Sequence, residues 1–301
     1  MLPKKIMKKK LFIPIFFTVL ILAAWTRFHV PPTHEFSVDT SKDKLLMELI
    51  AYFMQRGHFD PKDIGNDFSE NLYDTFLEML DGQKRYFLKK DIAQFDRYKY
   101  VLDDEFRALQ TNFFDLVYSR YLERRNETKS LYLELLEMPF DFNKKEEINV
   151  DYENQQYPST LRLKVEKWRK QLKLSTLNIL HSKLEEEEKL AAKDESYVPK
   201  TFEVLEKEAR EITKENMENY FSLMEDVREE DWFVSYLNAF VTQFDPHSVY
   251  FAPVDKDRFD ESMSGKYEGI GARLTKRNQA IKIVDVISGG PIWRDQSIEV
   301  G

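Results

Sequence analysis

The uneven placement of glycine is the feature of this sequence that most constrains its fold. Of the nine glycines, six fall within the last 37 residues, from Gly265 to Gly301, and residues 1–264 hold only three. Long stretches without glycine favour regular helix, whereas clustered glycines favour tight bends. The distribution predicts a mainly α-helical chain that becomes β-rich near residue 265, and the length suggests about two domains.

Apolar residues recur at three- and four-residue spacing from about Ser41 to Phe244, which is the period of an amphipathic α-helix. The predicted helices cover Leu45–Met54, Leu72–Leu80, Leu88–Tyr100, Asp103–Arg125, Ser130–Met138, Leu161–Leu184, a segment after Pro199, and Trp232–Phe240.

Capping residues and helix breakers indicate where these helices begin and end. Ser69 is a predicted N-cap, and Gly57 and Gly82 are predicted helix stops. Pro139 and Pro158 bracket a polar stretch without helical spacing, for which we expect irregular structure.

The first 27 residues are typical of an export signal. Five lysines precede an apolar run of 15 residues, Leu11–Trp25, which is shorter than the ~20 residues of a membrane-spanning helix. The lysines are Lys4, Lys5, Lys8, Lys9 and Lys10. The pattern predicts a signal peptide or an N-terminal membrane anchor over residues 1–27, with the remainder exported to the periplasm or held at the membrane facing it. Because Ala24-Trp25-Thr26 is the only small-x-small triplet, both cleavage and anchoring stay open.

Composition excludes several classes of function. The absence of cysteine excludes a disulfide framework, a Cys-ligated metal site and a Cys nucleophile. The net charge is −8, and loss of the six positive charges in residues 1–27 makes it −8 − 6 = −14, which argues against nucleic-acid binding and suits a soluble envelope protein. None of the five histidines lies four residues from another, so we predict no metal site and no cofactor.

Two clusters of reactive residue types have structural explanations. The side chains of Glu185–Glu188 point around a helix, so a solvated helix face is predicted there. Asp245, His247 and Ser248 are close in sequence, but the members of a catalytic triad converge from separate parts of a fold. Asp245 before Pro246 instead predicts a turn that ends the preceding helix.

Beyond Gly265 the apolar period changes to two, as in a strand. Before it, a stop at Phe251–Pro253 is followed by a predicted short helix from Asp255 to Gly265. After it, we predict an extended loop that leads into a strand over 267–274, a turn at Asn278-Gln279 and a strand over Ile281–Ile287. A short helix opened by Gly289-Gly290-Pro291 and an extended piece from Ile298 complete the region.

The closely spaced Gly269 and Gly271 have two interpretations. Leu274 stands where a dinucleotide fingerprint needs its third glycine, so nucleotide binding is not predicted. Consecutive backbone N–H groups at such a bend can hold a carboxylate, and the strand that follows can pair with an extended peptide. A plain bend that leads into a strand, without any ligand, is the alternative.

Three segments resemble the tail-specific, or carboxyl-terminal processing, serine proteases. Leu80–Leu88 (LDGQKRYFL) resembles the signature in the N-terminal helical domain of the longer members. Phe244–Pro253 (FDPHSVYFAP) resembles the segment that leads into their PDZ domain. Glu268–Ala272 (EGIGA), followed by Val286–Pro291, resembles the first half of that domain.

The resemblance implies a domain organisation and a binding site. It implies a helical domain over 28–243, a connector with a short helix over 244–264 and the first part of a PDZ domain, truncated, over 265–301. The implied site for a substrate's C-terminal carboxylate is Gly269, Ile270, Gly271 and Ala272, with Arg273 and Leu274 beginning the strand that pairs with the tail.

The resemblance also implies an activity, which is endoproteolysis of envelope proteins chosen by their C-terminal tails. The family uses a serine nucleophile and a lysine base, and no residue here matches either, so both are expected beyond Gly301 and the chain itself is expected to be inactive. The implied partners are the C-terminal tails of protein substrates and an adaptor protein. Contact with a membrane is expected only through an uncleaved N-terminal segment. A non-catalytic helical and PDZ binding or scaffold protein of the envelope is the alternative.

Overall fold

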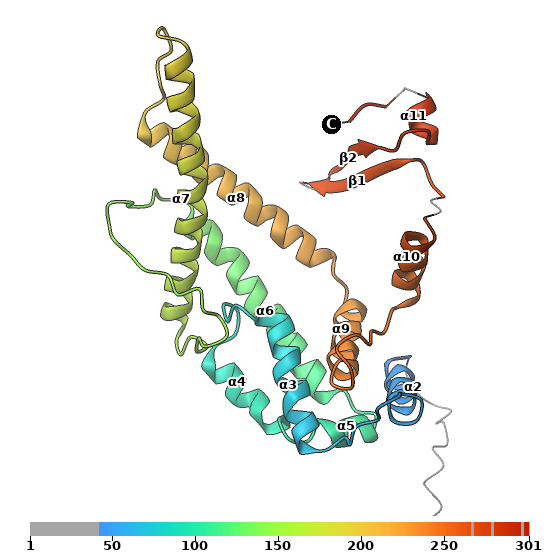
Figure 1. Ribbon diagram of the computed structural model, residues 1–301. Helices are drawn as coiled ribbons and strands as arrows, with labels where there is room; N and C mark the ends of the chain where they lie inside the picture. The colour runs from blue at the N-terminus through green and yellow to red at the C-terminus, as the bar shows by residue number, and fades with distance from the viewer. Residues whose placement is uncertain (1–41, 266–267, 278–279, 296–297, 301) are drawn as a thin grey trace, which may run out of the picture. The chain divides into compact units, whose positions relative to one another are not determined.

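The computed structural model describes residues 42–300 apart from 266–267, 278–279 and 296–297 (Figure 1). The predicted signal or anchor over 1–27 and the turn predicted at Asn278-Gln279 lie outside the described residues. Among the residues that are described, no helix is both long enough and apolar enough to cross a bilayer.

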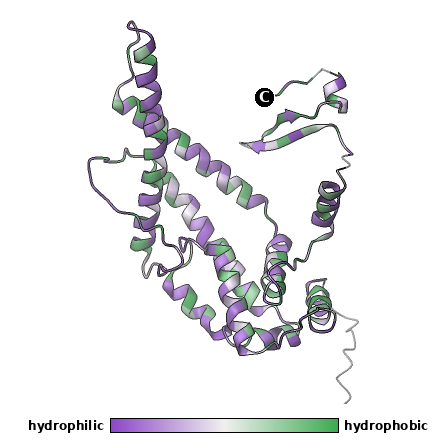
Figure 2. Ribbon diagram, in the orientation of Figure 1, coloured by the Kyte–Doolittle hydropathy of each residue, from purple (hydrophilic) through white to green (hydrophobic). Residues whose placement is uncertain are grey.

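The described chain is mainly α-helical, as the sequence predicts. Its elements in order are α2 (Lys42–Arg56), α3 (Asn66–Asp81), α4 (Lys89–Phe95), the 3-10 turn η1 (Asp96–Tyr98), α5 (Leu102–Arg107), α6 (Asn112–Leu135), α7 (Leu161–Lys193), α8 (Phe202–Asp226), α9 (Glu229–Val241), α10 (Pro253–Ser264), β1 (Ala272–Arg277), β2 (Ala280–Val286) and α11 (Pro291–Asp295). The helices carry hydrophilic and hydrophobic residues along the same length, as amphipathic helices do (Figure 2).

Aromatic side chains fill the core where α3, α5, α6 and α9 meet. Tyr236 of α9 is fully buried and its ring lies 4.9 Å from that of Phe76 in α3. Phe240, one turn later, stacks on Phe106 of α5 with ring centroids 4.1 Å apart. Since each buried aromatic side chain removes a large apolar area from water, this cluster stabilises the helical domain.

The two longest helices, α7 and α8, pack against each other beside this core (Figure 1). Leu180 of α7 and Leu205 and Ala209 of α8 form a small apolar cluster between them. The buried hydroxyls of Thr176 and Thr213 share a hydrogen bond of 2.9 Å across the same interface. With 33 residues, α7 is about 50 Å long.

One predicted cap is wrong. Ser69 does not begin α3, which starts three residues earlier at Asn66. Its side chain is fully buried and donates a hydrogen bond of 2.7 Å to Asp103 Oδ1 in α5. The sequence alone does not distinguish a serine that caps a helix from a serine that forms a hydrogen bond between two helices.

The predicted helix over Asp103–Arg125 is interrupted. α5 ends at Arg107, and Leu109 takes a left-handed backbone conformation with φ of 52°. The carboxylate of Glu105 accepts hydrogen bonds from Phe113 N at 3.1 Å and from Asn112 Nδ2 at 3.0 Å, so it satisfies groups at the start of α6. By contrast, no break separates Arg125 from Ser130, because α6 continues to Leu135.

Helix α10 begins at Pro253, two residues before the predicted start at Asp255. Pro253 was predicted to stop a helix, but it occupies the first turn of α10, where its missing N–H needs no partner. The helix ends at Ser264, and Gly265 follows in a left-handed conformation with φ of 65°, as expected of a helix stop.

The strands β1 and β2 form an antiparallel hairpin in which Ala272 pairs with Val286 and Arg277 with Ala280. Ala272 is the one buried hydrophobic side chain among the described residues of 268–300. Several large apolar side chains are exposed there, including Ile281 (73%), Trp293 (52%) and Val300 (58%). A two-stranded hairpin with uncovered apolar side chains is only marginally stable and tends to associate.

We therefore expect residues 28–264 to be more soluble than residues 28–301. The shorter chain keeps the aromatic core and loses the exposed apolar side chains of the hairpin. Sedimentation at matched concentrations measures the difference, and equal solubility of the two chains would contradict the expectation.

Candidate functional site

A buried carboxylate organises the loop that carries the Leu80–Leu88 segment. Asp81, the last residue of α3, is 3% exposed. Its Oδ1 accepts a hydrogen bond from Arg85 N at 2.8 Å, and its Oδ2 accepts from Tyr86 N at 2.9 Å and Phe87 N at 2.8 Å. One side chain thus satisfies three backbone donors that no helix or strand could satisfy.

Helix α3 ends just before Gly82, as predicted, but the glycine does not end the helix by the predicted mechanism. Gly82 has a right-handed backbone with φ of −56°, so no left-handed cap is formed. A Cβ atom there would lie 2.8 Å from the carbonyl oxygen of Glu78, so close approach to the helix explains the glycine. The helix ends where the N–H groups of Arg85, Tyr86 and Phe87 donate to the Asp81 carboxylate instead of to helix carbonyl groups.

Burial raises the pKa of Asp81 to about 6, although the three backbone N–H groups and the nearby Arg85 partly offset this rise. The proton of this carboxyl group is therefore bound more tightly in the folded chain than in the unfolded chain.

The same loop is tied to the two long helices. Trp168 Nε1 of α7 donates to Arg85 O at 2.9 Å, and Lys167 Nζ donates to Gln83 O at 2.7 Å. The guanidinium of Arg85 lies 4.8 Å from the Trp168 ring and donates to the hydroxyl of Tyr220 in α8 at 3.1 Å. The loop therefore joins α3 and α4 to α7 and α8.

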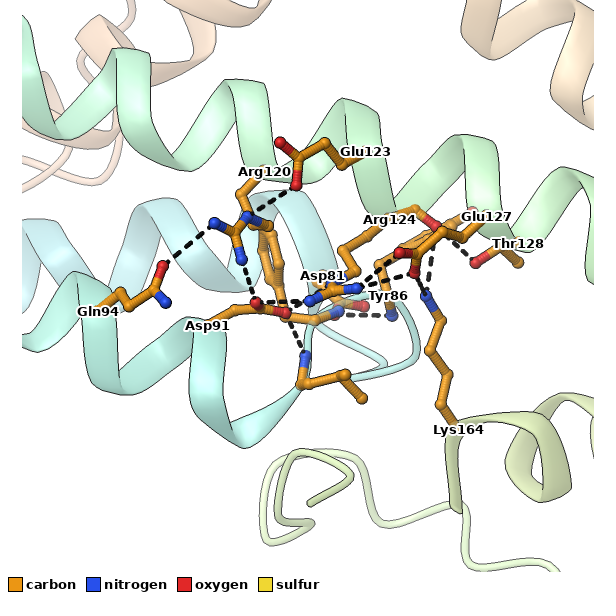
Figure 3. A network of polar contacts seen from close by, with 12 residues as sticks. Asp81, Tyr86, Asp91, Gln94, Arg120, Glu123, Arg124, Glu127, Thr128 and Lys164 are labelled. Carbon is orange, nitrogen blue, oxygen red and sulfur yellow. Dashed lines mark hydrogen bonds and ion pairs between the residues drawn. The ribbon is translucent and has the colours of Figure 1, made fainter. Parts of the chain in front are cut away.

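A second buried carboxylate, that of Asp91 in α4, meets two arginines of α6 (Figure 3). Arg124 contacts it in a bidentate way, with Nε 2.7 Å from Oδ2 and Nη2 2.8 Å from Oδ1. Arg120 Nη1 donates to Oδ1 at 2.7 Å, and Leu88 N donates to Oδ2 at 2.9 Å. Burial would raise the pKa of Asp91, but the hydrogen bonds from Arg124, Leu88 and Arg120 outweigh it and hold the pKa below its usual value.

Lys164 extends this network from α7 (Figure 3). Its side chain is 1% exposed, and Nζ lies 3.3 Å from Arg124 O and 3.5 Å from Glu127 Oε2. Burial lowers the pKa of Lys164. The groups in this network bind one another and the backbone, so its chemistry is that of a structural clasp between α4, α6 and α7.

The Asp245–Ser248 segment forms the predicted turn. Ser248 N donates to Asp245 O at 3.0 Å, which closes the turn. The Asp245 carboxylate contacts His247 Nδ1 and Ser248 Oγ, each at 3.2 Å, and the His247 side chain is 91% exposed. Asp245 therefore stabilises the turn by pairing with both neighbours.

The predicted solvated face over Glu185–Glu188 needs one correction. Glu187 is buried, and its Oε2 accepts hydrogen bonds from Tyr197 OH at 2.8 Å and Lys200 N at 2.9 Å. It thereby holds the turn between α7 and α8. Within the described ranges, no group of three or more His, Asp or Glu residues is placed to hold a metal ion.

The predicted carboxylate loop is a sharp bend before β1. Gly271 has a left-handed backbone with φ of 77°, and a Cβ atom there would lie 2.9 Å from Gly290 Cα. Ile287 N donates to Gly271 O at 2.8 Å, and Ile292 N donates to Ile270 O at 3.1 Å. The bend is therefore packed against the segment that joins β2 to α11, and the glycine at 271 is required by that approach.

The remaining predicted residues follow in β1. Ala272, Arg273 and Leu274 form its first half, and Arg273 lies opposite Asp285 of β2 with Nη1 3.6 Å from Oδ2. In the part of the sheet that is described, the second edge of β1 carries no strand. The Ile270 and Leu274 side chains are 53% and 50% exposed. The predicted site residues thus share one continuous segment with an open strand edge.

Sequence reasoning did not assign Ile287, Gly290 and Ile292 to this site. Val286–Pro291 was assigned to the segment that resembles this family, but its Gly289-Gly290-Pro291 sequence was interpreted as the start of a helix and not as a contact of Gly271. Gly290 faces Gly271 because both backbones approach within contact distance, and a sequence alone does not show which glycines meet.

Residues 50–254 match the family described as the tail specific protease N-terminal domain. The chain belongs to this family, which confirms the relationship indicated by the three sequence segments.

One relative is a tail-specific protease of Haemophilus influenzae, to which the chain is 24% identical over 301 residues. The match covers 98% of this chain and 40% of that protein. The chain therefore spans about two fifths of the length of this relative.

The raised pKa of Asp81 predicts a pH-dependent effect of Asp81→Asn. An amide cannot accept hydrogen bonds on both of its polar atoms, so the variant leaves a buried N–H unsatisfied and should lose about 2 kcal/mol at pH 7. The folded pKa lies above the unfolded value, so the wild type gains stability relative to the variant as pH falls from about 6 towards 4. We expect the deficit of Asp81→Asn to grow by about 2 kcal/mol between pH 7 and pH 4.5.

Urea unfolding of both proteins at the two pH values measures this change. Asp67→Asn, at an exposed position in the first turn of the same helix, is the control and should show a small deficit at both values. A deficit of Asp81→Asn that shrinks at pH 4.5 would contradict the assignment, because it would mean that the N–H donors outweigh burial.

The close approach of Gly271 predicts a specific effect of Gly271→Ala. The methyl group collides with backbone atoms of Gly290, whereas Gly289→Ala meets no atom within 4 Å although Gly289 has a similar φ of 82°. We expect Gly271→Ala to speed hydrogen exchange at Ile287 N–H at least tenfold and Gly289→Ala to do so much less. Equal exchange in the two variants would show that backbone strain, and not the contact, matters.

Proposed function

We propose that this chain is the N-terminal part of an exported serine endopeptidase that recognises envelope proteins through their C-terminal tails. The helical domain supplies the scaffold, and the Gly269–Leu274 segment with the hairpin supplies the first part of a substrate-binding PDZ domain. The serine nucleophile and lysine base are contributed by sequence after Gly301.

The observation that carries the proposal is the family match over residues 50–254, since this domain is named for tail-specific proteases. The open edge of β1 beside the glycine bend supports the binding role, because an extended tail can add to a strand edge and its carboxylate can meet backbone N–H groups. The exposed apolar side chains of the hairpin support the presence of further PDZ sequence that covers them.

Reading the coding sequence beyond the Gly301 codon tests the proposal. We expect an open frame that completes the PDZ domain and then encodes a serine and lysine protease core. A stop codon in well-covered sequence, with no such core in the neighbouring frame, would contradict it.

Peptidase activity gives a second prediction. The 301-residue chain should not cleave a protein with an apolar C-terminal tail, whereas the extended protein should, and replacement of its serine nucleophile by alanine should abolish cleavage. Cleavage by the purified 301-residue chain, retained through contaminant controls, would place the catalytic groups within these residues and overturn the assignment.

A further inference from the structure

A groove runs along the first half of α7 and is walled by the irregular segment over 139–158. It consists of two adjoining cavities of about 230 and 220 Å³, which share Glu147, Ile148 and Lys170. The first cavity reaches Leu177 and the second reaches Leu163. These residues are 14 positions apart on one helix, so the groove is about 21 Å long. That is the length of about six residues of extended polypeptide.

Lysine side chains of α7 fix the wall of this groove. Lys173 Nζ donates to Asp141 O at 2.6 Å and to Lys144 O at 3.2 Å, and Lys170 Nζ donates to Glu147 O at 3.0 Å. These contacts give carbonyl groups of an irregular segment charged donors in place of helix or strand partners. The groove is therefore a built feature of the folded domain.

Apolar side chains lie at both ends of the groove. Phe142 packs against the cluster around Leu180, and the α7 side chains of Leu163 and Leu177 are 46% and 42% exposed. Leu174 joins them in the first cavity. Exposed leucines at both ends of one groove are suited to contact a ligand with several apolar side chains.

The rim of the groove is cationic in a chain whose net charge is −8. Lys145 is exposed, and its side chain makes no ion pair or hydrogen bond with the rest of the described chain. Lys170 uses one donor on Glu147 O and keeps two. The Glu146 carboxylate is already taken by Arg169 and Lys173, so it does not cancel this charge.

Glu166 also lines the second cavity, but its carboxylate is paired with Arg169, so Glu147 is the acidic side chain that remains without such a pair. It lines the same cavity as Lys145 and Lys170, and as Lys144, which pairs with Glu146, so lysines outnumber unpaired carboxylates and the rim still attracts anions. An occupant of matching chemistry carries carboxylates spaced between apolar side chains.

We propose that this groove binds an extended, apolar polypeptide segment that carries side-chain carboxylates. The occupant pairs its carboxylates with Lys145 and Lys170 and places apolar side chains on Leu163, Leu177 and Phe142. That this occupant is the part of a substrate before its C-terminal tail rests on the proposed function. The binding of such a peptide in the groove does not depend on that function. A polypeptide fits better than an acyl chain, because polar side chains such as Glu166, Lys170 and Gln171 line the groove between the leucines at its two ends.

Fluorescence anisotropy with the 301-residue chain tests the proposal. The probe is a fluorescein-labelled six-residue peptide of alternating Leu and Asp with a C-terminal amide, so the glycine bend, which is assigned to a free C-terminal carboxylate, is not measured. We expect saturable binding that weakens at least fivefold in Lys145→Glu and at least fivefold in Leu177→Asp. The same peptide with Lys in place of Asp should bind at least tenfold more weakly.

Matched variants on the same helix serve as controls. Leu190 is 39% exposed and Lys189 is 73% exposed, and both lie in α7 outside the groove. Leu190→Asp and Lys189→Glu should leave binding unchanged, and circular dichroism should show unchanged helicity in all four variants.

Three results would overturn the proposal. They are the absence of saturable binding, equal loss in groove and control variants, and displacement by laurate with no preference between the acidic and basic peptides, which would indicate an amphiphile site. Each of them leaves the proposed protease assignment intact, since that depends on the reading frame beyond Gly301 and on the free carboxylate of a tail.

Discussion

The helical domain depends on the buried carboxylate of Asp81. A loop that leaves a helix in the interior exposes N–H groups that neither water nor a neighbouring strand can reach, and each unsatisfied group costs about 1–3 kcal/mol. Asp81 accepts hydrogen bonds from three of them. With the loop closed in this way, Arg85 presents its carbonyl to Trp168 and its guanidinium to Tyr220. One of the attachments of α7 and α8 to the rest of the helical domain thus depends on a side chain in α3.

Charged groups elsewhere in the domain take the place of regular secondary structure. The segment over 139–158 has almost no backbone ladder of its own, and lysines of α7 bind its carbonyl groups. Asp91 similarly binds Leu88 N and two arginines, and so joins α4 to α6. Many charged side chains of this domain therefore hold loops and helices together, and these side chains are not available to bind partners.

Helix content could be predicted from the sequence because apolar spacing and the scarcity of glycine act locally. Boundaries were less predictable, since Ser69 and Glu105 act on residues distant in sequence or in a neighbouring helix. The break at Leu109 needs a left-handed backbone at a residue that does not favour it, and the Glu105 carboxylate then binds donors at the start of α6.

The candidate binding segment could be located from Gly269 and Gly271, and the resemblance gave it a role. The contact between Gly271 and Gly290 could not be predicted, because it depends on how two backbones cross. Glu187 was misjudged for a similar reason, as the turn that it holds lies beyond the end of its own helix.

The crossing of Gly271 and Gly290 limits which substitutions the proposed binding segment can accept. Neither position can accept a side chain without displacing the other backbone, so the shape of the bend requires glycine at both positions. Ile270 and Leu274 carry no such restriction, because half of each side chain is open to solvent. Under the proposed function, substitutions at these two positions change which tails the segment prefers while the bend that presents them stays constant.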